Sequence, residues 1–177
     1  MGAAPVVVYL GLGSNLGDRR EHLQQALREL ERRRVRIERC SRVVEGPYIG
    51  PGGRQGEFLN AVVRAHTHLP PLQLLEVMQD VERQRGRRQP SHMQPRPLDV
   101  DLLLYGGWRV RHRRLIVPHR RLLQRRFVLE PLLQVLERGH PLRSQLQVHL
   151  EGLRDHQALT LHPAALATGG ALAAPSA

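Results

Sequence analysis

The order of strand-like and helix-like segments constrains the fold of this chain more than any other feature. Val6–Leu12 is β-branched and apolar, which is typical of a buried strand. Arg19–Arg33 carries apolar residues at helical spacing with charges between them, and Asp18 stands where an N-cap residue belongs. Arg34–Val44 alternates weakly between apolar and polar residues, as in a half-buried strand, and Phe58–Leu69 indicates another strand.

The second half of the chain continues this alternation. A helix is expected to begin at Pro70 and Pro71, because proline is tolerated in a first turn. Its apolar stripe is expected to be Leu72, Leu75, Met78 and Val81. The remaining expected elements are a strand at Leu98–Tyr105, a hairpin at Trp108–Val117, and helices at Leu122–Leu136 and Pro141–Leu150. This order predicts an α+β fold, a ferredoxin-like βαββαβ sandwich with an additional C-terminal hairpin and helices.

The length of 177 residues suits one domain, which we place at residues 1–162. From Pro163 onward the chain contains only Ala, Gly, Leu, Pro, Ser and Thr, so residues 163–177 are expected to form a disordered, low-complexity tail. Two longer irregular stretches, Gly46–Gly56 and Gly86–Pro97, interrupt the domain. Loops of this length are often functional, and we expect these two to close over a site.

Composition excludes several classes of protein. No apolar run approaches the roughly 18 residues of a membrane-spanning helix, so no contact with a membrane is expected. The apolar stretch Val6–Leu12 is short and has no basic lead, so it does not predict a secretory signal. A single cysteine, Cys40, excludes an internal disulfide framework and a cysteine-based zinc cluster, and is expected to pack as a small hydrophobe. The expected location is cytoplasmic.

The formal net charge is +11, and every one of the 27 basic residues is arginine. Such a charge indicates a polyanionic partner, for example a nucleotide, a nucleic acid or an acidic surface; the alternative is that it serves solubility alone. The absence of lysine excludes a P-loop lysine and Schiff-base chemistry. Dinucleotide-binding and P-loop motifs are also missing, because the spacing of Gly11, Gly13 and Gly17 does not match them.

Asp99 and Asp101 are the strongest candidates for chemistry. They stand at i and i+2 of an expected strand, so both carboxylates lie on one face, while Leu98, Val100 and Leu102 lie on the other. Two neighbouring carboxylates repel each other, and a divalent cation such as Mg²⁺ relieves that repulsion. The alternative is an exposed edge strand with two solvated acids. The many arginines that precede and follow this pair favour a site for a metal and a polyphosphate.

Several motifs, in order along the chain, resemble the 6-hydroxymethyl-7,8-dihydropterin pyrophosphokinase family. They begin with the segments 9–17 (YLGLGSNLG) and 58–62 (FLNAV). The most specific is segment 95–106 (PRPLDVDLLLYG), close to the family pattern PRxxDxDxLLxG. Segments 117–119 (VPH) and 125–132 (RRFVLEPL) complete the series, so the resemblance covers residues from about 6 to 150.

The resemblance implies a ferredoxin-like fold and an ATP-dependent reaction of folate biosynthesis. A diphosphoryl group passes from ATP to the hydroxymethyl oxygen of the pterin, and AMP is released. Asp99 and Asp101 would hold two Mg²⁺ ions, and Arg87 and Arg96 would stabilise the transition state. The positions implied to contact ATP are Gln79, Glu82, Arg114, His119 and Arg125. The positions implied to contact the pterin are Gly46, Pro47, Ile49, Phe58, Asn60 and Phe127, with the two phenylalanines stacking on its ring.

Each implied role has a plainer alternative. Phe58 and Phe127 could be core residues, and Asn60 a turn residue. Gln79 and Glu82 share a helix face and could simply be solvated, and His119 could be a loop histidine.

The sequence also departs from the family pattern. Gln89 stands where a second arginine is common, Met93 and Gln94 replace a Trp-Gly pair, and Gly46 replaces a threonine. These changes bear on nucleotide affinity and loop closure. Two other functions therefore stay open: a relative that binds nucleotide and pterin with little turnover, and a ferredoxin-like RNA-binding module. We expect small-molecule substrates, no nucleic acid, and a monomer.

Overall fold

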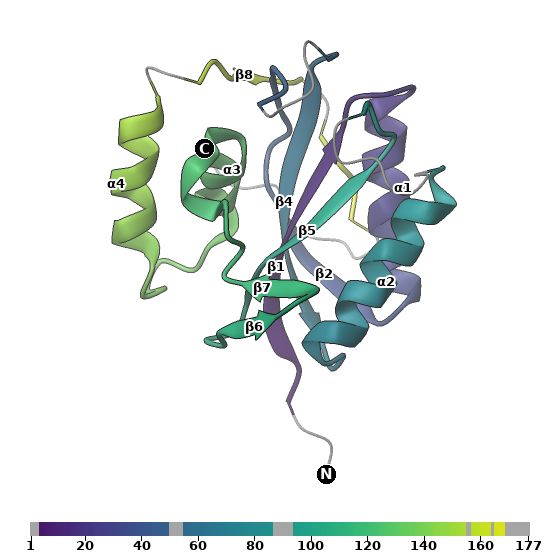
Figure 1. Cartoon of the computed structure of the whole chain (residues 1–177), viewed down its shortest axis with the longest axis vertical. Helices are drawn as coiled ribbons and strands as arrows, with labels where there is room; N and C mark the ends of the chain where they lie inside the picture. The colour runs from purple at the N-terminus through teal and green to yellow at the C-terminus, as the bar shows by residue number, and fades with distance from the viewer. Residues whose placement is uncertain (1–3, 50–54, 87–93, 155–156, 164, 169–177) are drawn as a thin grey trace.

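A computed structural model describes residues 4–49, 55–86, 94–154, 157–163 and 165–168 of the chain. Its centre is a mainly antiparallel sheet in which β1 lies between β4 and β5 (Figure 1). The strands of this sheet are β1 (Val6–Ser14), β2 (Val35–Cys40), β3 (Val44–Gly46), β4 (Phe58–Thr67), β5 (Asp99–Tyr105) and β8 (Thr160–Leu161). Both β2 and β3 pair with β4, and the path through the sheet is β5-β1-β4-β3-β8. The ferredoxin-like α+β prediction is confirmed.

The single strand expected at Arg34–Val44 is wrong in one respect, because the structure divides it into β2 and β3. The break lies at Ser41, whose backbone N–H donates to Val62 O at 2.9 Å and whose Oγ accepts from Val62 N–H at 2.9 Å. A side-chain oxygen thus replaces a backbone carbonyl at this point, and the pairing with β4 also shifts register between Ile37 and Arg39. Such interruptions are not visible in the weak alternation of the sequence.

Helices cover both faces of the sheet (Figure 1). Helix α1 (Arg19–Arg32) and α2 (Pro71–Gln84) lie on one face, and α3 (Arg126–Val135) and α4 (Arg143–Leu153) on the other. Each pair closes its own apolar core, since side chains alternate between the two faces of a strand. The first core contains Val8 and Leu10 of β1, whereas Tyr9 belongs to the second. The sheet is therefore buried on both sides.

Helix α1 agrees with its prediction. Asp18 accepts a hydrogen bond from the Glu21 N–H at 3.0 Å and so caps the helix. The expected apolar stripe of α2 is half right: Met78 and Val81 are buried as predicted, whereas Leu72 and Leu75 are only partly covered. Leu74 and Glu82 are buried in addition. The prediction failed in the first turn, where Leu72, Leu74 and Leu75 are all apolar and the sequence does not show which of them faces the core.

Two expectations near the C-terminal half differ from the structure in their bounds. The helix expected at Leu122–Leu136 is a 3-10 turn, η1 (Leu122–Gln124), followed by α3, with Arg125 in extended conformation between them. The expected hairpin is present as β6 (Val110–His112) and β7 (Leu115–Val117). The extended backbone at Arg125 matters for the site because it aims that side chain toward β5, as described below.

The C-terminal segment also differs from the expected tail. Residues 165–168 lie against α1: Gln24 Nε2 donates to Ala167 O at 2.6 Å, and Ala167 N–H donates to Gln24 Oε1 at 2.8 Å. Leu166 packs against the first core. A composition of small residues does not exclude such docking, since the backbone itself makes the contacts. Residues 169–177 lie outside the described part of the chain.

Two further features bear on the sequence analysis. Cys40 packs against the first core, and burial raises the pKa of its thiol to about 12. Among the helices in the described part of the chain, none combines the length and the apolar character needed to cross a membrane.

Candidate active site

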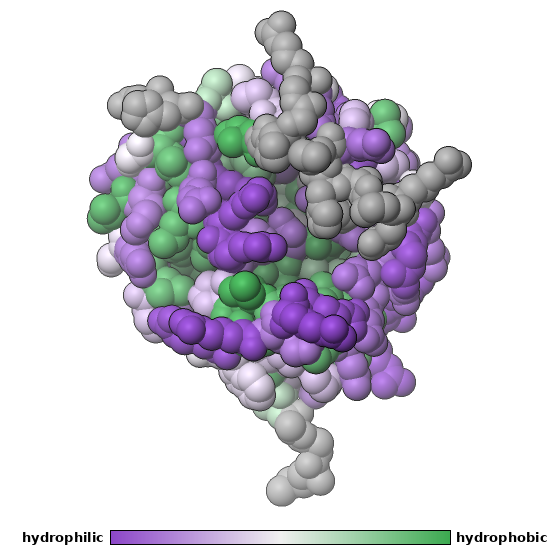
Figure 2. Space-filling model, in the orientation of Figure 1, coloured by the Kyte–Doolittle hydropathy of each residue, from purple (hydrophilic) through white to green (hydrophobic). Residues whose placement is uncertain are grey.

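A cavity opens on the face of the sheet that α3 covers. It lies beside the C-terminal end of β1 and the N-terminal ends of β4 and β5. Figure 2 shows apolar surface between hydrophilic side chains near the middle of the face that is turned to the viewer. Nine residues implied by the family resemblance line the cavity: Pro47, Ile49, Phe58, Asn60, Arg96, Asp99, Asp101, Arg125 and Phe127. They come from the loop after β3, from β4, from the segment before β5, from β5 itself and from the residues around the start of α3, so only the fold brings them together.

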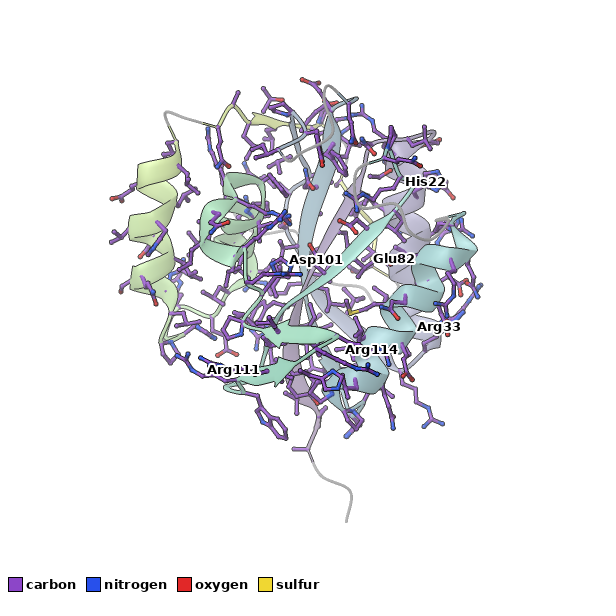
Figure 3. The ribbon with its side chains drawn as sticks, viewed as in Figure 1. His22, Arg33, Glu82, Asp101, Arg111 and Arg114 are labelled. Atoms are coloured by element: carbon purple, nitrogen blue, oxygen red, sulfur yellow. The ribbon has the colours of Figure 1, made fainter. Side chains whose placement is uncertain are left out.

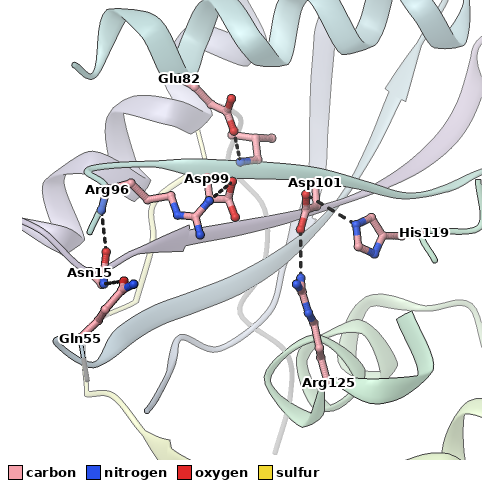
Figure 4. A network of polar contacts seen from close by, with 9 residues as sticks. Asn15, Gln55, Glu82, Arg96, Asp99, Asp101, His119 and Arg125 are labelled. Atoms are coloured by element: carbon pink, nitrogen blue, oxygen red, sulfur yellow. Dashed lines mark hydrogen bonds and ion pairs between the residues drawn. The ribbon is translucent and has the colours of Figure 1, made fainter. Parts of the chain in front are cut away.

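Asp99 and Asp101 point into this cavity from β5, as their spacing predicted. Their side chains are 24% and 31% exposed, whereas Val100 between them packs into the core on the other face. Arg96 NH1 lies 3.5 Å from Asp99 Oδ1, and Arg125 NH1 lies 3.4 Å from Asp101 Oδ2 (Figure 4). Both distances are long for an ion pair, so each guanidinium lies near its carboxylate without forming a close salt bridge.

The carboxylate pair suits Mg²⁺ held jointly by protein and phosphate. Among the described residues, no three His, Cys, Asp or Glu side chains gather into a group that could hold a metal ion unaided. Magnesium commonly takes only one or two protein carboxylates and completes its coordination with substrate phosphates and water. Asp99 and Asp101 supply that number of hard oxygen ligands on one face, and nearby arginines supply cations for the remaining phosphate charge.

Arg96 is held in place by Asn15, a residue that the sequence analysis treated only as part of a turn. The Arg96 N–H donates to Asn15 Oδ1 at 2.8 Å, and Asn15 N–H donates to Arg96 O at 3.2 Å. The Asn15 amide also donates to Gln55 Oε1 at 3.1 Å (Figure 4). Asn15 is 7% exposed. Its hydrogen bonds join the end of β1 to both of the long loops. Its role depends on partners 40 and 81 positions away, so no local signal identifies it.

Aromatic and amide groups line the opposite part of the cavity. Phe58 is 8% exposed, and Phe127 is half-buried, with the Arg125 guanidinium carbon 5.5 Å from its ring centre. Asn60 is buried beside Phe58 on β4. A Cβ at Gly13 would lie 3.0 Å from Asn60 Oδ1 and 3.4 Å from Phe58 Cδ1, so a side chain there would press on the Asn60 amide and touch the Phe58 ring. Gly13 is a second contributor that the sequence analysis missed.

His119 lies beside Asp101 but does not line the cavity. Its Nε2 is 3.8 Å from Asp101 Oδ1, and its backbone N–H donates to Leu103 O at 3.0 Å. Burial lowers the pKa of His119, and the positive charge of Arg125 lowers it further, although Asp101 opposes both. The imidazole is therefore harder to protonate than that of an exposed histidine, although it lies beside a carboxylate.

The structure separates the other implied ATP-contact residues from the cavity. Glu82 is 5% exposed, so the solvated alternative is wrong for it, and its Oε1 accepts from Val100 N–H at 2.7 Å. It lies on the opposite side of β5 from Asp99 (Figure 4). Gln79 is half-buried on α2. Arg114 lies on the exposed turn of the β6–β7 hairpin, 3.4 Å from Glu76 (Figure 3).

Gly46 lies at the end of β3, paired with Phe58, and does not reach the cavity wall. A Cβ there would lie 3.0 Å from Leu159 Cδ1 and 3.1 Å from Ala158 O. The C-terminal segment before β8 therefore occupies the space that a threonine would need, which explains this departure from the family pattern. Arg87, Gln89 and Met93 lie outside the described residues.

Comparisons with known proteins agree with this arrangement. A family model described as 7,8-dihydro-6-hydroxymethylpterin-pyrophosphokinase (HPPK) matches residues 9–137. Curated relatives include a 2-amino-4-hydroxy-6-hydroxymethyldihydropteridine pyrophosphokinase of Bacillus subtilis, 35% identical over 84% of this chain and 89% of that protein. The enzyme of the same name from Aquifex aeolicus is 42% identical over 72% of this chain and 79% of that protein.

Other relatives are longer proteins. A mitochondrial folate synthesis bifunctional protein of Arabidopsis thaliana is 39% identical over 84% of this chain, yet the chain spans only 26% of its length. Among solved structures, wild-type Plasmodium falciparum HPPK-DHPS with pteroate is similar at a TM-score of 0.63 and 12% identity. That match covers 86% of this chain and 46% of the other, and it supports the fold alone.

Proposed function

The chain belongs to the 7,8-dihydro-6-hydroxymethylpterin-pyrophosphokinase family, whose members transfer pyrophosphate from ATP to hydroxymethyldihydropterin in folate synthesis, and we propose that this cavity carries out that transfer. In the reaction the hydroxymethyl oxygen bonds to the β-phosphorus of ATP. The bond from that phosphorus to the oxygen bridging to the α-phosphorus breaks, AMP leaves, and the hydroxyl proton is released. The substrates are therefore ATP and a reduced pterin.

Asp99 and Asp101 would hold two Mg²⁺ ions together with the phosphates of ATP. Bound there, Mg²⁺ would supply Lewis-acid polarisation of the phosphoryl group and promote loss of the hydroxyl proton. The two aspartates fix where the phosphates lie, because they project from a strand whose other face is buried in the core. A site on a rigid strand is positioned more accurately than one on a loop.

Arginine side chains would neutralise the charge that moves between the phosphates. Arg96 and Arg125 flank the aspartates at 3.5 and 3.4 Å and line the same cavity. Asn15 holds the backbone of Arg96 and so fixes the point from which its side chain extends toward Asp99. Arg87 is proposed for the same role from the resemblance alone, and Gln79, Glu82, Arg114 and His119 remain proposed ATP contacts.

The pterin would lie between Phe58 and Phe127. A flat heterocycle gains from offset stacking on aromatic rings, and both rings face the cavity. Asn60 would read the edge of the pterin, since a carboxamide both donates and accepts hydrogen bonds. Pro47 and Ile49 would supply backbone contacts at the rim, next to Gly46. A monomeric, cytoplasmic enzyme remains our prediction.

The observation that carries this proposal is one cavity that joins a carboxylate pair, two arginines and an aromatic, amide-bearing wall. The test is to incubate the purified chain with ATP, Mg²⁺ and 6-hydroxymethyl-7,8-dihydropterin and to separate the nucleotides by chromatography. We expect AMP only when the pterin is present, and none from an Asp99→Asn/Asp101→Asn double variant. The matched control is Asp80→Asn, because Asp80 pairs with Arg83 on α2, away from the cavity.

Three outcomes are informative against the proposal. Formation of ADP would mean ordinary phosphoryl transfer and a wrong reaction. Tight ATP binding by a folded chain without any AMP would favour the weakened relative. RNA binding that weakens steeply with salt would favour the RNA-binding module instead.

A further inference from the structure

One aromatic side chain of the cavity has no role in the proposed reaction. Tyr48 lies in the loop that follows β3, is half-buried, and lines the cavity together with Phe58 and Phe127. Its ring stacks on that of Phe58, with 6.0 Å between ring centres and 27° between ring planes. Tyr48 therefore contacts the ring that, under the proposed function, would stack on the pterin.

The position of Phe58 in the sheet limits how a ligand can reach it. Phe58 is on β4, and the neighbouring strands are β1 on one side and β3 on the other. Gly13 of β1 lies so close to Phe58 that a Cβ there would be 3.4 Å from its Cδ1. Tyr48 follows β3 and approaches from the other side. Gly13 thus lies beside one edge of the Phe58 ring, and the Tyr48 ring lies against one of its faces.

No ligand ring fits between Tyr48 and Phe58 as they stand. Carbon atoms in van der Waals contact are about 3.5 Å apart, so a ligand sandwiched between two rings needs their planes to be about 7 Å apart. The two ring centres are only 6.0 Å apart, which is an upper limit on the separation of roughly parallel planes. A ligand that stacks on this side of Phe58 must therefore displace Tyr48.

We propose that Tyr48 occupies the place of the pterin on Phe58 in the unliganded protein and leaves it when the pterin binds. This inference rests on the proposed pterin site. In this arrangement Tyr48 shields an aromatic surface from water while the site is empty, and it competes with the pterin for Phe58. Competition lowers the apparent affinity for the pterin, because part of the binding free energy replaces the lost ring contact. This competition concerns only the pterin, so it leaves the affinity for ATP unchanged.

The test is the dissociation constant of 6-hydroxymethyl-7,8-dihydropterin, measured by titration calorimetry with Mg²⁺ and an ATP analogue that has a methylene between its α- and β-phosphorus. That analogue cannot undergo the transfer. We expect Tyr48→Ala to bind the pterin about two- to tenfold more tightly than wild type, because an aromatic pair contributes that much to the competing contact. Tyr48→Phe keeps the ring and should stay much closer to wild type than Tyr48→Ala does. The dissociation constant of the nucleotide analogue should not change in either variant.

The outcomes separate this inference from the function on which it rests. Unchanged or weaker pterin binding by Tyr48→Ala would overturn the displacement of Tyr48 and make the residue an added wall or a bystander. Tyr48→Leu repeats the comparison with an apolar side chain, in case the alanine variant fails to fold. Absence of pterin binding in wild type and in all three variants would overturn the pterin site itself, and the inference with it.

Discussion

Two side chains that do not line the cavity, those of Asn15 and Glu82, hold the backbone of the strand segments that carry the site. Asn15 provides the clearest case, because it joins the backbone of Arg96 to β1 by two hydrogen bonds and reaches Gln55 with its amide. Glu82 has a comparable role on the other side of β5, where its carboxylate accepts from the Val100 N–H. A strand at the edge of a sheet has unpaired N–H groups, and Glu82 satisfies one of them between the two aspartates.

The first prediction concerns Asn15. Asn15→Ala leaves the buried Arg96 N–H without its acceptor and should lower the free energy of unfolding by about 1–3 kcal/mol. It should also lower kcat, since the Arg96 guanidinium is no longer held near Asp99. Asn15→Asp is the matched control: it keeps the acceptor for Arg96, loses the amide donor to Gln55 and to the Gly56 carbonyl, and adds a negative charge. Urea denaturation and AMP formation measure the two effects, and equal loss in both variants would contradict the role assigned to Oδ1.

The second prediction separates two roles for Glu82. Glu82→Ala removes the acceptor of the Val100 N–H and should lower the free energy of unfolding by about 1.5–3 kcal/mol. Glu82→Gln keeps an acceptor oxygen and should lose less. If Glu82 instead contacts the nucleotide, as the resemblance implies, Glu82→Gln will raise the KM for ATP while stability stays near that of wild type. Denaturation and steady-state kinetics on the same two variants decide between these roles.

At the scale of elements, the extended residue between η1 and α3, Arg125, interrupts the helical layer beside the site. In a continuous helix the directions of Arg125 and Arg126 would be fixed about 100° apart around the helix axis. The extended residue instead sends them in different directions: Arg125 approaches Asp101, while Arg126 pairs with Glu130 at 2.9 Å and donates to Gln157 O at 2.8 Å. Two neighbouring arginines therefore serve different purposes.

The third prediction uses that pair as its own control. Arg125→Ala should raise the KM for ATP about tenfold or more, because a charge-assisted contact to phosphate is lost, and should change stability little. Arg126→Ala should lower the free energy of unfolding by about 1–3 kcal/mol, because it removes contacts to Glu130 and to the backbone after α4, and should leave the KM for ATP unchanged. If Arg125→Ala lowered the free energy of unfolding and Arg126→Ala raised the KM for ATP, the binding role of Arg125 and the structural role of Arg126 would both be wrong.

Element order and the carboxylate pair followed from the sequence because both depend on short-range periodicity. Asp99 and Asp101 share a face whenever that segment is a strand, whatever the rest of the fold does. Asn15 and Tyr48 were missed because their roles depend on partners that only the folded sheet brings near. The break at Ser41 and the extended Arg125 were missed for a related reason, since tertiary contacts override a weak local pattern there.

At the scale of the whole molecule, the C-terminal segment crosses between the two helical layers. After α4 the chain pairs as β8 with β3 on the edge of the sheet and then lies against α1 on the opposite face. It thus joins the layer of α3 and α4 to that of α1 and α2 without lining the cavity. A segment of this kind contributes to stability, and its removal should affect the fold far more than the chemistry.

The last prediction follows from that path. Deleting residues 164–177 removes the two hydrogen bonds between Gln24 and Ala167 and the packing of Leu166 on the first core. The free energy of unfolding should fall by about 1–3 kcal/mol, and AMP formation below the melting temperature should stay near that of wild type. Deleting only residues 169–177 is the matched control and should change neither quantity. Gln24→Ala in the full chain should reproduce part of the loss. Equal stability of the two truncated chains would mean that the docked residues add nothing, whereas a selective loss of activity would place this segment in the catalytic machinery.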